Sequence, residues 1–264
     1  MSIRSACQVF AISRSTYHYQ PDTDRDQQVI EKLLELAERY PTRGFGMLFT
    51  MLRRQGCAWN HKRVHRVYCA LKLNKRRKGK KRLPSRNPAP LSVPDSINQC
   101  WSIDFMSDSL WCGRVFRTFN VVDDYNREAL AIEVDLNLPA RRIIRVMDRV
   151  AAWRGYPARI RMDNGPELTS IKLADWAEDH GVELEFIKPG RPMQNSFVER
   201  FNRTYREEVL DLYVFKTLAQ VREITDIFLI DYNKDRPHAS LGKLTPVEYA
   251  EANKGPENSN LTWH

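Results

Sequence analysis

The spacing of apolar residues changes partway along this 264-residue chain, and the change limits the folds that the chain can adopt. Up to about residue 73, apolar residues recur every three or four positions, as they do on one face of an α-helix. From about residue 100, three short segments rich in β-branched and aromatic residues indicate strands, and amphipathic helices then alternate with two more strands. The order βββαβαβ predicts an α/β fold, with a mixed five-stranded sheet flanked by helices behind an all-α N-terminal part.

Three helices are expected within residues 27–73. The first contains Val29, Ile30, Leu33, Leu34, Ala37 and Tyr40 at helical spacing. The second helix ends at Gly56, and Asn60 can cap the third. This order predicts a helix-turn-helix segment. Residues 1–26 look like an incomplete helical segment, in which Ser13 can cap a short helix, and we expect a module to be missing upstream.

The remaining domain limits follow from composition. Residues 74–98 lose the apolar periodicity and contain four prolines, so we expect an extended basic linker. Residues 99–250 should form the α/β core, with one helix starting near Gln194 and another after it. Residues 251–264 are acidic and Asn-rich and should form a flexible tail.

Positive charge is concentrated between Arg43 and Arg86, where the chain has 15 Lys or Arg residues and no Asp or Glu. Subtracting these 15 charges from the net charge of +9 leaves −6 for the rest of the chain. Such a segment suits a polyanion such as DNA, and the alternative is the solvated surface of a small helical bundle. The predicted DNA contacts here are Lys62, Arg63, Arg66, Lys75, Arg76, Arg77, Lys78, Lys80, Lys81 and Arg82.

Two classes of protein are disfavoured by composition. No apolar run approaches the roughly 20 residues that span a bilayer, and the N-terminus lacks the pattern of a signal peptide, so we expect a cytoplasmic protein without a membrane partner. The five cysteines form no C-x-x-C pair, which argues against a disulfide framework and against a zinc site.

Three acidic residues stand at positions that suit metal binding. Asp104 lies inside the first strand, on the face opposite Trp101 and Ile103, where a carboxylate is costly unless it is paired or binds a cation. Asp163 ends the fourth strand, at the carboxyl edge of the sheet. Glu199 lies on the helix that follows the last strand. Each alone is more typical of a turn former or a solvated ion pair, but the three could converge if that helix packs beside the first and fourth strands.

A cluster made only of carboxylates suits a hard divalent cation, Mg²⁺ or in its place Mn²⁺. Two such ions, about 3.5–4 Å apart, can stabilise the attacking and leaving oxygens of a phosphoryl transfer. The residues therefore predict a two-metal site that needs no serine or cysteine nucleophile.

Three motifs resemble those of the DDE transposases and retroviral integrases: WSIDF around Asp104, DNGPE at 163–167, and KPGRPMQNSFVERFN at 188–202. Asp163 and Glu199 are separated by 35 residues, the spacing typical of that superfamily. The closing segment 232–249 resembles the downstream-frame proteins of one large insertion-sequence family.

This resemblance implies a ribonuclease-H-like core and a catalytic, metal-binding triad of Asp104, Asp163 and Glu199. It also implies a DNA transposase that cleaves and joins strands at the ends of a mobile element, working in the bacterial cytoplasm at the nucleoid. Synapsis of element ends and target DNA implies a homo-oligomer, and the family implies an upstream-frame partner or a frameshift fusion with it.

Polar residues near Glu199 are further candidates for DNA contact. They are Lys188 and Arg191 in the preceding Gly/Pro loop, and Asn195 and Arg203 on the helix. Each could equally be ordinary surface polarity. Arg236 and His238 are left without a role, since a loop His after Pro is more often a structural hydrogen-bonding group. Two other functions stay open, a non-catalytic DNA-binding regulator and a nuclease of the same fold.

Overall fold

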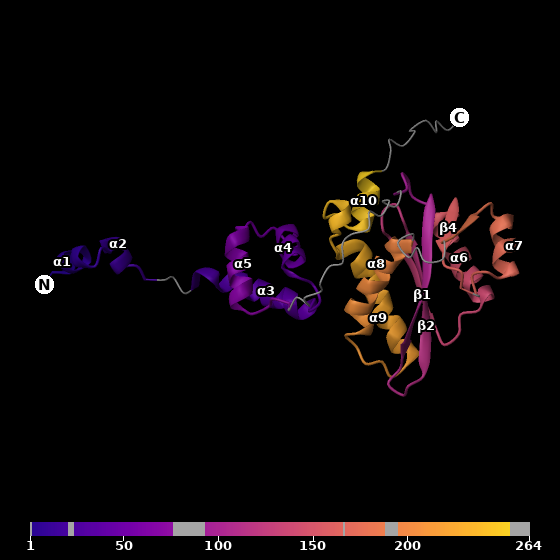
Figure 1. The fold of residues 1–264 in the computed structure, drawn as a ribbon, viewed down its shortest axis with the longest axis horizontal. Helices are drawn as coiled ribbons and strands as arrows, with labels where there is room; N and C mark the ends of the chain where they lie inside the picture. Colours follow the sequence, from indigo (N-terminus) through magenta and orange to yellow (C-terminus); the bar gives the residue numbers. More distant parts are fainter. Residues whose placement is uncertain (1, 21–23, 76–92, 166, 188–194, 254–264) are drawn as a thin grey trace, which may run out of the picture. The chain divides into compact units, whose positions relative to one another are not determined.

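The computed structural model describes residues 2–20, 24–75, 93–165, 167–187 and 195–253 (Figure 1). The chain divides into two units, residues 1–78 and 79–264, and each is described by itself. No helix among the described residues is long and apolar enough to cross a membrane.

The first unit is all-helical, as the sequence predicts. Its N-terminal part contains the short helices α1 (Ile3–Val9) and α2 (Arg14–Tyr17), and the Ser13 side chain caps α2 by accepting a hydrogen bond from the Thr16 N–H. A 3-10 turn at Asp24–Asp26 leads into α3 (Gln27–Arg39), α4 (Phe45–Arg54) and α5 (His61–Ala70). Gly56, at φ 84°, follows α4, and the Asn60 side chain caps α5. The inward faces of α3, α4 and α5 form one buried cluster that excludes water from Leu33, Leu48, Leu52, Val64 and Val67.

The second unit is built on the predicted five-stranded mixed sheet. Its strands are β1 (Cys100–Ser109), β2 (Val115–Asp123), β3 (Ala129–Asp135), β4 (Arg159–Met162) and β5 (Glu183–Phe186). Their order across the sheet is β3-β2-β1-β4-β5. The first three strands are antiparallel, and β4 and β5 run parallel to β1.

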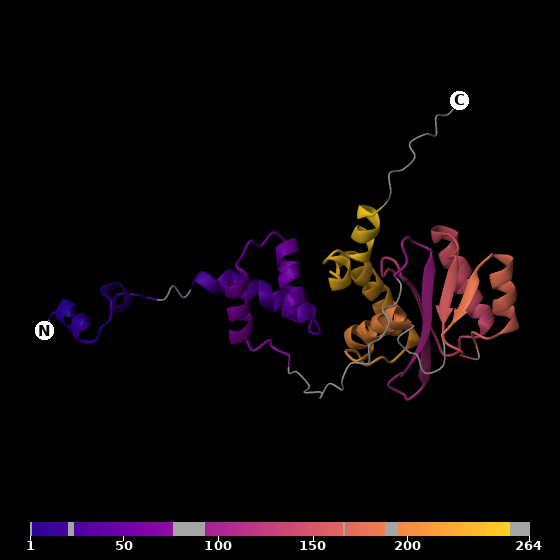
Figure 2. The same cartoon turned by 45° about the horizontal axis from the view of Figure 1, so that its top comes forward.

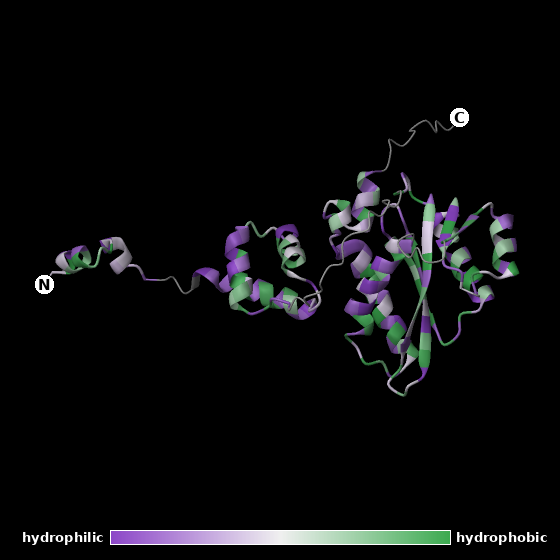
Figure 3. Ribbon diagram, viewed as in Figure 1, coloured by the Kyte–Doolittle hydropathy of each residue, from purple (hydrophilic) through white to green (hydrophobic). Residues whose placement is uncertain are grey.

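Helices cover both faces of the sheet (Figures 1 and 2). Helices α6 (Ala140–Arg154) and α7 (Ile171–Asp179) pack on one face, and α8 (Ser196–Tyr205) and α9 (Leu218–Ile230) on the other. Strand β1 divides its side chains between two cores: Trp101 and Ile103 pack with α6 and α7, whereas Met106 packs with α8 and α9. The alternation of apolar and polar residues along β1 (Figure 3) therefore puts Asp104 on the α8 face, as its period predicts.

The C-terminal part of the second unit contains helical turns that continue α8 and α9, and a last helix, α10. A π-helical turn extends α8 over Arg206–Leu210, and a second extends α9 over Asp231–Asp235. A 3-10 turn follows at Ala239–Leu241. Helix α10 (Pro246–Ala252), capped by Thr245, runs two residues beyond the predicted core limit at 250. Helix α7 starts at Ile171, with Ser170 in the N-cap position.

Asn98, at the end of the predicted linker, is tied to the second unit. Its N–H donates to Asp123 Oδ2 (3.0 Å) and its side chain donates to the Arg154 carbonyl (2.5 Å). The part of the linker at 76–92 and most of the predicted tail lie outside the described residues. The domain limits proposed from composition stay predictions.

Candidate active site on the sheet

Asp104 lies in the middle of β1, where its register partner on β2 is Asn120. The Asn202 side chain on α8 donates to Asp104 Oδ2 (2.7 Å), and the Asn120 side chain donates to Asn202 Oδ1 (2.7 Å). All three side chains are partly or fully buried. A chain of side-chain hydrogen bonds thus fixes α8 against β1 at the position of this carboxylate.

The pairing of β1 with β4 brings Asp163 toward Asp104. In this parallel pair, Cys100 is opposite Arg159 and Ser102 is opposite Arg161, an offset of 59 residues. The same offset continued for two residues would set Asp163 opposite Asp104, with Cα atoms about 5 Å apart. Strand β4 ends at Met162, and the Asp163 carboxylate accepts a hydrogen bond from the Gly165 N–H (3.0 Å).

A buried ion pair shows that the two aspartates share a face of the sheet. The Ser102 hydroxyl donates to Asp124 Oδ1 (2.5 Å), and Arg161 donates to Asp124 Oδ2 (2.8 Å). Ser102 and Arg161 therefore point to the same side, and the period of two puts Asp104 and Asp163 on that side as well. The sequence interpretation missed Asp124, because an acid before a turn is usually a turn former.

Glu199 lies on α8, one turn before Asn202. Val198 and Phe201 beside it are buried in the core, whereas Glu199 is exposed. The start of α8 is fixed by Asn195, which is 3% exposed and donates to the Ile103 carbonyl (3.3 Å). Helix α8 therefore lies along β1, with Glu199 between two side chains that contact this strand.

Electrostatics couple the three predicted carboxylates. The pKa of Asp104 is raised to about 6, mainly by burial; the hydrogen bond from the Phe105 N–H opposes this, and the negative charges of Asp163 and Glu199 add to it. Among the residues that the structure describes, no three His, Cys, Asp or Glu side chains are placed so that they could already hold one metal ion. The structure thus brings the three into electrostatic contact without forming a ready-made metal cage.

Comparison with known proteins identifies the family. Models of the integrase core domain match residues 94–192 and 180–246, and an HTH-like domain model matches residues 23–81. A 31.7 kDa protein of insertion element IS407 from Burkholderia multivorans is 39% identical over 251 residues, 95% of this chain and 91% of that protein. The chain belongs to the insertion-sequence transposase family.

A second insertion-element relative and a solved structure support the family and the fold of this transposase-family chain. A protein of insertion element IS476 from Xanthomonas euvesicatoria is 36% identical over 98% of this chain and 75% of its own length. A chain of the simian T-cell lymphotropic virus intasome, solved with a PP2A regulatory subunit, superposes with a TM-score of 0.52 at 15% identity, over 88% of this chain and 80% of that one. The predicted ribonuclease-H-like fold is thereby confirmed.

A hollow of about 380 Å³ opens beside Glu199 in this transposase-family chain. Its lining residues are Val122, Arg127, Ser196, Phe197, Glu199, Arg200, Arg203, Tyr232, His238 and Ser240. The Arg127 guanidinium stacks 3.6 Å above the centre of the Phe197 ring, and burial lowers its pKa. Arg203 was a predicted DNA contact, whereas Arg127 was missed, because it follows Asn126 in what the sequence shows only as a turn.

The other predicted DNA contacts differ in their exposure, and several lie outside the described residues. Lys62 and Lys75 are exposed, as DNA contact requires. Asn195 is buried against β1, so its predicted contact with DNA does not fit this structure. Arg76, Arg77, Lys78, Lys80, Lys81, Arg82, Lys188 and Arg191 lie outside the described residues. Arg236 forms an ion pair with Glu208 (2.8 Å), and the buried His238 ring lies 3.1 Å from the Tyr232 carbonyl, so both have structural contacts.

Two of the predicted DNA contacts, Arg63 and Arg66, form ion pairs with the same acidic residue. Asp26 forms ion pairs with Arg63 (2.9 Å) and Arg66 (2.6 Å), which hold the pKa of Asp26 below its usual value. The sequence interpretation counted both arginines as unpaired, because Asp26 is 37 residues from the nearer one.

Asp26→Asn is therefore expected to strengthen DNA binding. Freed from Asp26, Arg63 and Arg66 can each neutralise a phosphate, so the slope of log K against log salt should steepen by up to about 2. Glu35→Gln, which removes an equal charge from an exposed pair with Lys32, is the matched control. Salt titrations of a fluorescent duplex with the full chain measure both slopes. Equal slopes for the two variants would exclude Arg63 and Arg66 from the DNA contact.

Asn202→Ala is expected to shift the pH dependence of catalysis. Without the hydrogen bond from Asn202, the ionised form of Asp104 loses a donor, so its pKa should rise further above 6. The acidic limb of the rate profile should move up in the same direction, with near-normal rates above pH 8. Thr204→Ala, which removes a hydroxyl bonded within α8, should leave the profile unchanged. A reaction rate that falls by the same factor at every pH would show that Asn202 does not act through Asp104.

Proposed function

We propose that this chain is a DNA transposase that cleaves and joins DNA strands at the ends of an insertion element. Asp104, Asp163 and Glu199 would be the catalytic, metal-binding residues. The observation that carries the proposal is the buried Asp104, whose pKa responds to the other two carboxylates and whose side chain is bonded to the helix that carries Glu199.

The donor chemistry of the three residues fits Mg²⁺, or Mn²⁺ in its place. Carboxylate oxygens are the ligands that these hard cations prefer. Burial, and to a smaller extent the charges of Asp163 and Glu199, raise the pKa of Asp104, and a bound cation would offset both effects. Two such ions would supply charge stabilisation for a phosphodiester whose oxygens gain negative charge during transfer.

The residues of this chain would orient the DNA around those carboxylates. Asn202 and Asn120 would hold Asp104 in one rotamer, and the Ser102–Asp124–Arg161 contacts would keep β1 and β4 in register below it. Arg203, on the rim of the hollow beside Glu199, would bind a phosphate. Water would be the first nucleophile and the freed 3′-hydroxyl the second.

The other partners are proposals of the same kind. The helix-turn-helix segment, the linker cations and Lys188 and Arg191 would bind terminal repeats and target DNA. Bringing element ends together would require a homo-oligomer, and an upstream-frame protein or a fusion with it would complete the recognition part. The place of action would be the bacterial nucleoid.

Incubation of the full chain with labelled element-end DNA, a target duplex and Mg²⁺ tests the function. Joined products that require both Mg²⁺ and an element end are the expected result. Hydrolysis of generic DNA without joining would show a nuclease of the same fold. Binding without any change in the strands, with or without added upstream-frame product, would show a DNA-binding regulator.

A further inference from the structure

A second group of cations lies at the open edge of the sheet, outside the candidate active site. Among the strands that the structure describes, β3 lies at the edge of the sheet and pairs with β2 alone. Arginines from α6 and α9 gather along it, and we call this group the basic edge: Arg141, Arg142, Arg145, Arg149 and Arg222.

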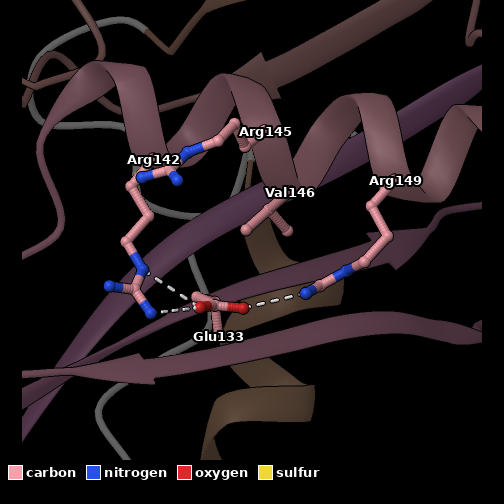
Figure 4. Close-up of a pocket in the computed structure, with 5 residues that line it drawn as sticks. All are labelled: Glu133, Arg142, Arg145, Val146 and Arg149. Atoms are coloured by element: carbon pink, nitrogen blue, oxygen red, sulfur yellow. Dashed lines mark hydrogen bonds and ion pairs between the residues drawn. The ribbon is translucent and has the colours of Figure 1, made fainter.

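Helix α6 and β3 enclose a hollow of about 260 Å³ (Figure 4). Arg142 and Arg149 reach from α6 to Glu133 of β3, whereas the Arg145 side chain lies along α6 at the hollow. Arg142 donates to Glu133 Oε1 (2.8 and 3.0 Å), and Arg149 donates to Glu133 Oε2 (2.8 Å). Burial alone would raise the pKa of Glu133, but these hydrogen bonds outweigh it and lower the pKa. The carboxylate is therefore ionised, and both of its oxygens accept hydrogen bonds from arginines.

The acids do not balance the arginines. Asp135 pairs with Arg142 and Arg222, and Glu133 pairs with Arg142 and Arg149. With Asp148, an exposed acid of α6 three residues from Arg145, three carboxylates stand against five arginines and leave a net +2. Arg145 makes no hydrogen bond or ion pair with any other residue that the structure describes, and Arg141 is exposed. The basic edge therefore has charge available for an external anion.

The spacing of the exposed arginines suits a phosphate backbone. Arg141, Arg145 and Arg149 are each four residues apart on α6, which separates them by about 6 Å along the helix. Like charges at this spacing repel one another and destabilise an isolated helix, and a bound polyanion would remove this repulsion. Duplex DNA presents one charge per about 1.7 Å of its axis, so it can meet every step of the ladder.

Two features favour DNA over a second copy of this chain. A two-fold interface would set the same positively charged surface of each copy against the other. Arg222 also donates twice to the Val134 carbonyl (2.9 and 3.0 Å), which occupies an edge group that an added strand would need.

The basic edge cannot hold the DNA phosphate that meets Asp104. Glu133 is the register partner of Phe119, whose side chain packs in the α6 core, so the hollow opens on the face opposite α8. Strand β2 also separates β3 from β1. We propose that the basic edge binds the phosphate backbone of a DNA segment distinct from the one at the carboxylates.

This inference rests on the proposed function for the choice of DNA as ligand, but its test is binding alone. The full chain, without Mg²⁺, is titrated against a fluorescent random-sequence duplex at several salt concentrations. The variant R141Q/R145Q/R149Q should lower the slope of log K against log salt by about 2 to 3, and R145Q alone by about 1. The control K172Q/K216Q/K234Q, which removes three exposed charges from α7, the loop before α9 and the turn after it, should change the slope by less than 1.

Unfolding temperatures of all variants check that they fold, and R145Q keeps the test valid if the triple variant does not, because Arg145 has no described partner to lose. Equal slopes for R145Q and the wild type would overturn the proposal. Weakened binding to poly-L-glutamate with an unchanged DNA slope would assign the surface to an acidic protein and overturn it too. Failure of strand joining would count against the proposed function and leave these slopes as they are.

Discussion

Glu199→Gln is expected to abolish strand joining while DNA binding is retained. The amide keeps the shape of the side chain but removes the negative charge that a hard cation needs. Since the metal supplies several kcal/mol of transition-state stabilisation, we expect the rate to fall at least about 10³-fold. Glu199 is exposed on α8 and no contact of its carboxylate holds the described core together, so the fold should be unaffected.

The measurement compares joined product per bound element end, with Glu207→Gln as the control. Glu207 is an exposed acid two turns further along the same stretch of helix, and its loss should leave joining unchanged. A Glu199→Gln chain that joins strands at the wild-type rate would remove Glu199 from the triad. A chain that no longer binds DNA would show that Glu199 has a structural role instead.

Asp104→Asn is expected to stabilise the metal-free protein while it abolishes catalysis. The pKa of Asp104 is raised from 3.8 to about 6, so near neutral pH the folded protein holds a buried charge that the environment disfavours. A shift of about two units corresponds to about 3 kcal/mol, which sets the upper limit of the gain. Asp104 accepts hydrogen bonds from the Phe105 N–H and from Asn202, one on each oxygen. The single oxygen of an amide can accept only one of them on its own, so the gain stays below this limit.

The sign of the pH dependence follows from the direction of this shift. Because the folded pKa lies above the unfolded one, the contribution of Asp104 to stability is fully present below about pH 3.8 and is lost as the pH rises through about 6. The gain of Asp104→Asn over the wild type should therefore grow from about pH 3.8 and reach its full size above about pH 6. Burial also raises the pKa of Asp124 to about 6. Asp124 is present in both proteins, so it adds the same pH dependence to the stability of each.

Urea unfolding in EDTA between pH 5 and pH 8 measures the gain. Asp108→Asn, on the same strand but ion-paired with Arg206 (3.1 Å), should give no stabilisation. Mg²⁺ should stabilise the wild type and leave Asp104→Asn unchanged, since only the wild type can bind it. An Asp104→Asn protein that is less stable than the wild type at pH 8 would contradict the burial of an unfavourable charge.

Much of the fold could be predicted from the sequence, because apolar spacing and capping residues act within a few positions. The strand period of WSIDF put Asp104 opposite Trp101 and Ile103, and the structure agrees. Asn60 and Ser13 cap the predicted helices, and Gly155 and Gly181 end α6 and α7 at positive φ. The limits of α7 were less certain, since Ser170 and the residues before it are all compatible with a helix start.

The partners of individual polar side chains could not be predicted in the same way. The sequence shows Arg63 and Arg66 as a free basic face, but only the fold brings Asp26 onto them. It shows Asn195 as a polar residue near a helix start, but the packing of α8 on β1 buries it.

The amino-acid order by itself determined the classes of element and their succession, because each is written in a short stretch of chain. It also proposed the three acids, which remain a prediction. Tertiary structure alone decided which charges meet. Asn202 and Asp104 are 98 residues apart, and they touch because the strand order puts β1 under α8. The physical reason is that the strength of an ionic or polar contact depends on distance and burial, and both are properties of the packed molecule.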